Sequence, residues 1–168
     1  MYGIGEKVLY GSHGVCVVSG LEDRTVDRVK RQYLVLEPAD QTGAKFFVPT
    51  HNEAALSKLR PLLTREELDA LLRSEEVRQE AWIEDENARK QAYRELISSG
   101  DRTALIRMVG SLQRHRQAQI EAGRKFHLCD ENFLRDAERL LSAEFSVVLG
   151  LEPGQVGSYV LQAMGETK

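Results

Sequence analysis

The sequence predicts an α+β chain of two domains, a small antiparallel β-barrel followed by an all-α helical domain. Two observations predict this fold class. Up to about residue 60 the chain consists of short stretches of β-branched and aromatic residues separated by turn residues. After that point, apolar residues recur at helical spacing between capping residues. The pattern changes near Arg60 and Pro61, so the predicted domains are residues 1–60 and 61–168.

About four or five short strands are expected in the first domain, because turn-forming residues interrupt it often. The clearest candidates are VLY at 8–10, VCVVSGLE from Val15, QYLVL at 32–36 and AKFFV at 44–48. A turn is predicted at 40–43, and Pro49 ends the last of these runs. Strands of this number and length are typical of an SH3-like or Tudor-like barrel.

Capping residues and apolar stripes predict the helices of the second domain. Thr64 and Glu67 form a capping box before a short helix that ends near Arg73. A longer helix is expected from about Glu75 to Ile97, and later helices are expected after Asp101, Asp130 and Glu152. The strongest apolar face follows Asp130 and should form the centre of the helical core: Phe133, Leu134, Ala137, Leu140, Leu141 and Phe145.

Composition limits the classes of function. The 168 residues carry a formal net charge of −3, which argues against a protein that coats nucleic acid through bulk positive charge. Any nucleic-acid contact is therefore expected to be local. Cys16 and Cys129 stand alone, which predicts two reduced thiols, and no run approaches the ~20 apolar residues that span a bilayer. We expect a cytoplasmic protein.

No sequence motif indicates catalysis. The four His and two Cys residues form no HExxH or CxxC pattern, so no metal site is predicted. The Gly3-Ile4-Gly5 stretch lacks the third glycine and the following helix of a phosphate loop. We expect no enzyme activity, no cofactor and no small-molecule substrate.

The only tryptophan, Trp82, lies where the charge of the chain changes sign. Acids dominate from 66 to 86, and bases outnumber acids from 89 to 125. On a continuous helix, Trp82, Arg89 and Tyr93 would share one face. An aromatic residue beside a basic surface favours a nucleic-acid contact, whereas a packing role is commoner for tryptophan in general. Both interpretations stay open on residue chemistry alone.

Two groups of motifs resemble the CarD/CdnL-type bacterial transcription regulators. The stretches GEKVLYGSHGV, QYLVL and FFVPT are similar to the RNA-polymerase-interacting domain that is also found in transcription-repair coupling factors. The SGD at 99–101, followed by a helix and by GRKFHLCDENFLRDAERLLSAEF, is similar to the helical domain of that family. The order and spacing of these motifs make the resemblance specific.

The resemblance implies a bacterial regulator, associated with the nucleoid through RNA polymerase. Its Tudor-like domain would dock on the polymerase β subunit, and its helical domain would contact promoter DNA at the upstream edge of the melting bubble and stabilise the open complex. Trp82 matches a tryptophan that enters the minor groove there. The implied DNA-binding residues are Trp82, Asn87, Arg89, Lys90, Arg94, Arg124 and Lys125. The implied polymerase-binding residues are Arg24, Lys45, Phe46, Phe47 and Val48.

The sequence departs from the family pattern in three places. Gly11 stands where proline is usual, Phe47 stands where arginine is common, and IEDE at 83–86 follows Trp82 where bases are common. Counted back from the SGD motif, Trp82 lies about one helical turn early, roughly 6 Å along a helix axis. The alternative function is a protein-interaction adaptor, bound to polymerase or another protein, with no direct DNA contact and with Trp82 packed as a structural residue.

Overall fold

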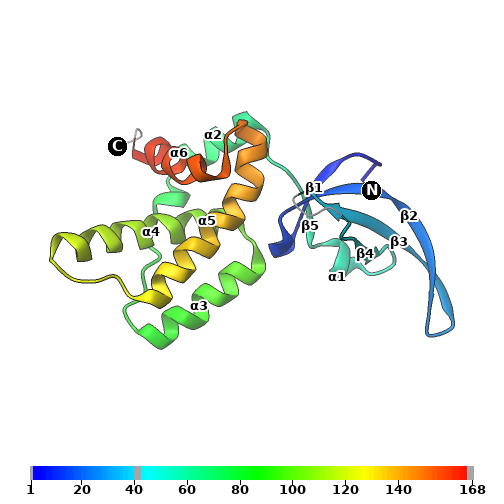
Figure 1. Cartoon of the computed structure of the whole chain (residues 1–168), viewed down its shortest axis with the longest axis horizontal. Helices are drawn as coiled ribbons and strands as arrows, with labels where there is room; N and C mark the ends of the chain where they lie inside the picture. Colours follow the sequence, from blue (N-terminus) through cyan, green and yellow to red (C-terminus); the bar gives the residue numbers. More distant parts are fainter. Residues whose placement is uncertain (1, 40–42, 166–168) are drawn as a thin grey trace. The chain divides into compact units, whose positions relative to one another are not determined.

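The computed structural model describes residues 2–39 and 43–165. The chain divides into two compact units between Leu62 and Leu63 (Figure 1). The first unit is an antiparallel β-sheet with one short helix, and the second is helical. This arrangement confirms the predicted α+β class.

The first unit is built on a five-stranded sheet with the strand order β4-β3-β2-β1-β5. Its strands are β1 (Lys7–Tyr10), β2 (Val15–Val26), β3 (Val29–Pro38), β4 (Phe46–Pro49) and β5 (Leu59–Pro61). All neighbouring strands pair in antiparallel fashion. The described sheet is open, with β4 and β5 at its edges, so the predicted closed barrel is not confirmed.

Shorter elements complete this unit. A 3-10 turn, η1 (Gly11–His13), joins β1 to β2, and helix α1 (Glu53–Leu56) precedes β5. The side chain of Asn52 caps α1 by accepting from the Ala55 amide at 3.1 Å. Neither α1 nor β5 is predicted from the sequence. The predicted turn at 40–43 lies outside the described residues except for Gly43.

Alternation along the strands decides which face of the sheet is buried. Leu34, Leu36 and Val48 point to one face, where they pack in a core with four further residues: Val8, Cys16, Val18 and Leu59. Val35 follows Leu34 and Phe47 precedes Val48, and the two are paired with each other across β3 and β4. Because successive side chains alternate between faces, Val35 and Phe47 both lie on the opposite face. The sheet therefore has a second face outside this core cluster, on which Val35 is buried and Phe47 is half-buried.

Strands β2 and β3 continue beyond the other strands as a two-stranded hairpin (Figure 1). Its tip is a two-residue turn at Asp27 and Arg28, which have positive φ angles of 52° and 66°. Such values belong to a type I′ turn, whose twist suits a hairpin. The tip carries the exposed side chains of Val26 and Val29, directly paired across the two strands.

The second unit contains helices α2 (Arg65–Arg73), α3 (Glu86–Ser99), α4 (Arg102–Glu121), α5 (Leu128–Leu149) and α6 (Pro153–Gly165), with a 3-10 turn η2 (Glu76–Arg78). The predicted capping box at Thr64 and Glu67 is present. Gly100 and Gly150 end α3 and α5 in the left-handed conformation that glycine adopts without strain. In the described part of the chain, no helix combines the length and apolar character needed to cross a membrane.

Two helix starts differ from the prediction. The helix expected from Glu75 begins only at Glu86, after the turn η2 and an extended segment at 79–85. The helix expected to follow an Asp130 cap begins at Leu128, so Asp130 lies inside its first turn and is fully buried. The two causes differ. Before α3, Glu80 accepts from the Ala81 and Trp82 amides in place of helical hydrogen bonds. In α5, both Asp130 oxygens accept from Arg89, so Asp130 does not cap the helix.

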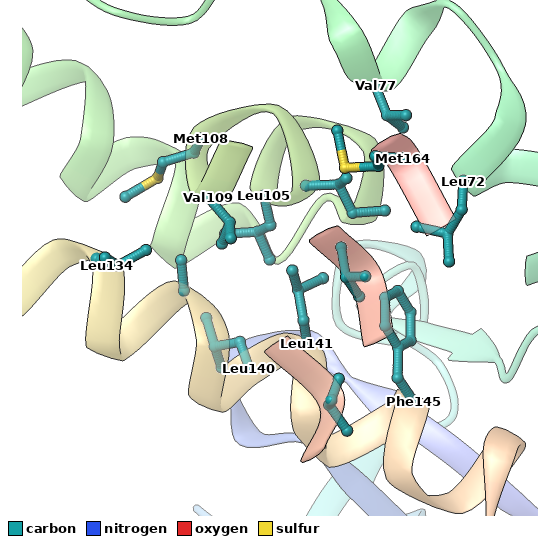
Figure 2. Close-up of a cluster of buried hydrophobic side chains, with 14 of the residues drawn as sticks. Leu72, Val77, Leu105, Met108, Val109, Leu134, Leu140, Leu141, Phe145 and Met164 are labelled. Carbon is teal, nitrogen blue, oxygen red and sulfur yellow. The ribbon is translucent and has the colours of Figure 1, made fainter. Parts of the chain in front are cut away.

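The helical core confirms the predicted stripe on α5 (Figure 2). Leu134, Leu140, Leu141 and Phe145 pack there against Leu105, Met108 and Val109 of α4, Leu72 of α2, Val77 of η2 and Met164 of α6. Burying an aliphatic or aromatic side chain of this size contributes roughly 1.5–3 kcal/mol. This core therefore supplies the rigid support for the surface segments of the unit.

A buried carboxylate fixes the point at which the chain enters this unit. The Leu63 amide donates to Glu144 Oε2 at 2.7 Å, and Arg102 of α4 forms an ion pair with the other oxygen. Glu144 is only 2% exposed, so both of its oxygens need partners. The first residue of the helical unit is thereby bound to α5.

Candidate interaction sites

On the second face of the sheet, Arg24 and Phe47 form a joint surface. The Arg24 guanidinium carbon lies 4.0 Å from the centre of the Phe47 ring, and its Nε lies 3.5 Å from Glu22 Oε1. A cation over an aromatic face contributes about 0.5–1 kcal/mol at an exposed site. Two of the predicted polymerase-binding residues, from β2 and β4, are thus brought together.

The other predicted residues of this segment divide by orientation. Lys45 is exposed, whereas Val48 is fully buried in the sheet core. Phe46 is half-buried, with its ring centre 5.3 Å from that of Tyr10 and 4.6 Å from that of His13. Lys45 and Phe47 therefore offer side chains to a partner, and Phe46 and Val48 chiefly support the strand.

Strand β4 also offers its backbone. Within the described residues it pairs with β3 alone, because it forms the edge of the sheet. An edge strand carries N–H and C=O groups that a strand from another protein can bind. Phe47 of the Arg24–Phe47 surface lies on this edge strand, so one partner could use both the edge and the surface.

In the helical unit, side chains hold Trp82 on the extended segment at 79–85. Glu80 Oε1 accepts from the Ala81 and Trp82 amides, each at 3.0 Å, and Ser111 Oγ accepts from the Ala81 amide at 2.8 Å. A hydrogen bond from Ser111, helped by these backbone amides and by Arg114, holds the pKa of Glu80 below its ordinary value. The segment is thus fixed without helical hydrogen bonds.

Arg89, predicted to bind phosphate, points into the protein instead. Its side chain is 4% exposed and binds Asp130 through two hydrogen bonds, 2.8 Å from Nε and 3.0 Å from Nη2. Its Nη1 donates to the Ile83 carbonyl at 2.9 Å. Burial opposes the guanidinium charge, but the Asp130 carboxylate outweighs it, and the pKa of Arg89 is raised. A phosphate could reach this group only by displacing a buried partner.

Trp82 lies between two other side chains. The Arg89 guanidinium carbon is 4.2 Å from the Trp82 ring centre. The His115 ring is stacked on Trp82 with a centre-to-centre distance of 3.6 Å and an interplanar angle of 15°. A nearly parallel ring at this distance fills one face, so the guanidinium must lie on the other. Trp82 is therefore covered on both faces.

Tyr93 completes the group and is fully buried. Its hydroxyl donates to the Ala81 carbonyl at 2.9 Å, and burial raises the pKa of this phenol to about 12. Trp82, Arg89 and Tyr93 do meet, as the sequence predicts, but not as a stripe on one helix. Arg89 and Tyr93 belong to α3, and Trp82 reaches them from the preceding extended segment.

The remaining predicted DNA-binding residues lie on the surface. Asn87 and Arg94 are exposed on α3, and the partly exposed Lys90 lies 3.5 Å from Glu86. Their spacing of three and four residues places them on one side of that helix. Arg124 and Lys125 are exposed in the connection from α4 to α5. These five residues, unlike Arg89, are available to a polyanion.

Three residues of this region are missed by sequence reasoning: His115 and Ser111 of α4, and Asp130 of α5 as an ion-pair partner. His115 and Ser111 carry no local signal, because they lie about 30 residues from the segment that they contact. Asp130 resembles a helix cap in sequence. Beside Trp82 is a surface hollow of about 450 Å³ lined by Glu80, Trp82, Glu84, Ser111, Arg114 and His115.

In the part of the chain that the structure describes, no three His, Cys, Asp or Glu side chains gather as a metal site would require. Cys16 is buried and Cys129 is half-buried, and neither forms a disulfide. The open sheet edge of the first unit and the exposed bases of the second are surfaces on which a partner could bind.

Comparison with known families makes this assignment more specific. Residues 2–60 match the family model described as the CarD-like/TRCF RID domain. The sheet unit therefore carries a CarD-like RNA-polymerase-interacting domain, which confirms the resemblance of the N-terminal motifs. The match supports a polymerase-interacting transcription factor, with the polymerase β subunit as the partner that this domain implies.

Proposed function

We propose that this chain is a bacterial, cytoplasmic transcription regulator. It docks on the RNA polymerase β subunit through the sheet unit and contacts promoter DNA through the helical unit, where it stabilises the open complex. The observation that carries the proposal is the family match over residues 2–60. The open β4 edge beside Arg24 and Phe47 supplies a surface suited to such docking.

Docking would proceed by strand addition. A polymerase strand pairs with the free edge of β4, so backbone hydrogen bonds provide affinity. Phe47 and the Arg24 guanidinium above it provide specificity, because the pair combines an apolar surface with a positive charge. Lys45 adds a second charge at the start of the strand.

DNA contact would use the exposed bases of the helical unit. Arg94 and Lys90 lie on one side of α3, and Arg124 and Lys125 follow α4. Few phosphate contacts suffice when docking on polymerase gives the unit a high effective concentration near the promoter. The net charge of −3 is compatible with this bivalent mode, although it disfavours DNA binding by the chain alone.

Trp82 would favour a distorted duplex at the edge of the melting bubble. An aromatic side chain inserted at a partly unstacked base step stabilises that step relative to regular duplex. In the structure both faces of Trp82 are covered and its Nε1 is buried without a hydrogen-bond partner among the described residues.

A second candidate function is the adaptor, which binds polymerase or another protein and leaves DNA untouched. The covering of Trp82 by Arg89 and His115 favours it, since a packed tryptophan needs no nucleic-acid role. Both candidates share the docking step. They differ in whether Trp82 affects the promoter complex.

Replacing Trp82 distinguishes the two. Trp82→Ala should shorten the lifetime of the open complex, measured by heparin challenge on a promoter fragment, while co-purification with polymerase is retained. The double variant Arg124→Ala/Lys125→Ala should stabilise the open complex less than the wild type does, and this stabilisation should depend less on salt concentration. Thermal unfolding controls for folding. An unchanged open-complex lifetime in a folded Trp82→Ala protein would establish the adaptor instead.

A further inference from the structure

The two side chains that cover Trp82 are held very differently. Arg89 is bound to both oxygens of Asp130 and to the Ile83 carbonyl. Removing it would leave the fully buried Asp130 carboxylate without its charge partner, which is strongly unfavourable. The Arg89 side of Trp82 is therefore a permanent part of the fold.

The His115 side is held weakly. Among the described contacts of this imidazole is a single hydrogen-bonding contact, 3.2 Å from its Nε2 to Gln119 Nε2 on the same helix. Phe126 approaches the imidazole only as a tilted ring, with the ring centres 6.2 Å apart. His115 is partly exposed, so rotating its side chain leaves no buried charge behind.

Space for such a rotation lies on the same side of Trp82. The hollow of about 450 Å³ is lined by both Trp82 and His115, and Arg89 is not part of its lining. Its rim carries Arg114, which is half-exposed and lies 3.5 Å from Glu80. A flat aromatic ring can therefore approach Trp82 from this side, where Arg114 and the acidic Glu80 and Glu84 also line the hollow.

The stack itself has the geometry of a stacked base. The imidazole lies nearly parallel to the indole, with the rings 3.6 Å apart. Aromatic side chains bind unpaired bases by this kind of face-to-face stacking. The position on Trp82 that a base would take is therefore already filled from within the protein.

We infer that His115 occupies the stacking position of an unpaired promoter base on Trp82, and that the base displaces it when DNA is bound. His115 is thus an autoinhibitory contact that lowers the affinity of the helical unit for melted DNA. This inference rests on the proposed DNA contact of Trp82. It adds to that proposal which face of the Trp82 ring the base stacks on, and that His115 must first leave this face.

Two substitutions at His115 have opposite expected effects. His115→Ala frees the Trp82 face and should tighten binding to a promoter fragment with a pre-melted bubble, in complex with polymerase, about 2- to 10-fold. That factor corresponds to the strength of one ordinary aromatic pair. His115→Phe keeps a ring on Trp82, and being apolar it leaves the stack less readily. Its affinity should equal or fall below that of the wild type.

Gln117→Ala is the matched control, because Gln117 is exposed on the same helix and bonds only to Glu121 among the described residues. It should leave affinity unchanged. Since Trp82 is the only tryptophan, its fluorescence follows the stack directly. Adding pre-melted DNA should change the Trp82 emission in the wild type, and in His115→Ala the change should occur at lower DNA concentration.

The double variant Trp82→Ala/His115→Ala separates this inference from the proposed function. The gain from His115→Ala should vanish when Trp82 is absent, because the two residues then no longer interact. Lower or unchanged affinity in a folded His115→Ala protein, or equal gains for Ala and Phe, would overturn the inference. No effect of Trp82→Ala alone would instead reject the proposed DNA contact.

Discussion

At the scale of single residues, the most strongly perturbed group with a defined partner is Tyr93. Its side chain is fully buried, its hydroxyl donates to the Ala81 carbonyl, and burial raises its pKa to about 12. The unfolded chain has a phenol pKa near 10. A group whose pKa is raised on folding contributes stability that is complete below the unfolded value and is lost as the pH rises toward the folded value.

Wild-type protein should therefore lose up to about 3 kcal/mol of unfolding free energy from this group between pH 10 and 12. Tyr93→Phe lacks the hydroxyl, so it should be less stable by about 1–3 kcal/mol at neutral pH, where the Ala81 carbonyl loses its donor. The difference in unfolding free energy between the wild type and Tyr93→Phe should shrink above pH 10. Urea unfolding at a series of pH values tests this, with Tyr33→Phe in the sheet unit as the control. A difference that stays constant up to pH 12 would contradict the prediction.

At the scale of elements, the Arg89–Asp130 pair joins α3 to α5 and fixes the segment that carries Trp82. Asp130→Asn should destabilise the protein by roughly 3–5 kcal/mol, because it leaves a buried guanidinium without an anion. Chemical denaturation measures the loss. The exposed pair between Lys90 and Glu86 is the control, and Glu86→Gln should cost less than about 0.5 kcal/mol.

Asp130→Asn should also loosen the packing around Trp82, so acrylamide should quench the Trp82 fluorescence more strongly than in the wild type. A replacement of both partners, Arg89→Met with Asp130→Leu, should recover much of the stability, since an apolar pair needs no compensating charge. If Asp130→Asn were as mild as Glu86→Gln, the buried pair would not be holding α3 against α5.

The limits of sequence reasoning are also clearest at this scale. Local signals were sufficient for the capping box at Thr64 and for the apolar stripe of α5, and the structure confirms both. The helix expected from Glu75 to Ile97 is wrong before Glu86. There, Glu80 takes the amides of residues 81 and 82, and Asp85 caps α3 through the Ala88 amide.

The missed residues depend on distant contacts. Ser111 and His115 act on a segment about 30 residues away, and Asp130 pairs with an arginine 41 residues away. No spacing rule connects such positions, because only the packing of α3, α4 and α5 brings them together. Helical periodicity predicted that Trp82, Arg89 and Tyr93 lie close together, and they do. The reason was wrong, because Trp82 lies on an extended segment and not on the helix that carries the other two.

At the scale of the whole molecule, two units joined at Leu62 and Leu63 suggest binding through two surfaces. If the sheet unit supplies docking, Arg24→Ala should weaken binding to the polymerase β subunit about 3- to 10-fold, through loss of the charge above Phe47. It should also reduce the promoter effect, because the helical unit then loses its effective concentration. Surface plasmon resonance with the isolated β subunit measures the first effect.

Lys30→Ala is the matched control for that experiment. Lys30 lies on the same hairpin, is exposed and forms an ion pair with Asp23 at 3.8 Å. Arg24 is paired directly with Arg31, the residue after Lys30, so the side chains of Lys30 and Arg24 point to opposite faces of the hairpin. Loss of the Lys30 side chain should leave affinity for the β subunit unchanged. Equal losses for Lys30→Ala and Arg24→Ala would indicate a general charge effect in place of a specific surface.

The hydrogen bond from the Leu63 amide to Glu144 has a mechanical consequence. A force along the backbone between the two units, which divide between Leu62 and Leu63, reaches the helical unit at Leu63. Glu144 belongs to α5 and is also ion-paired with Arg102 of α4, so the load passes to two long helices and does not fall on the first turn of α2. If the two units bind two partners, tension at Leu63 would therefore be shared with α4 and α5 through Glu144.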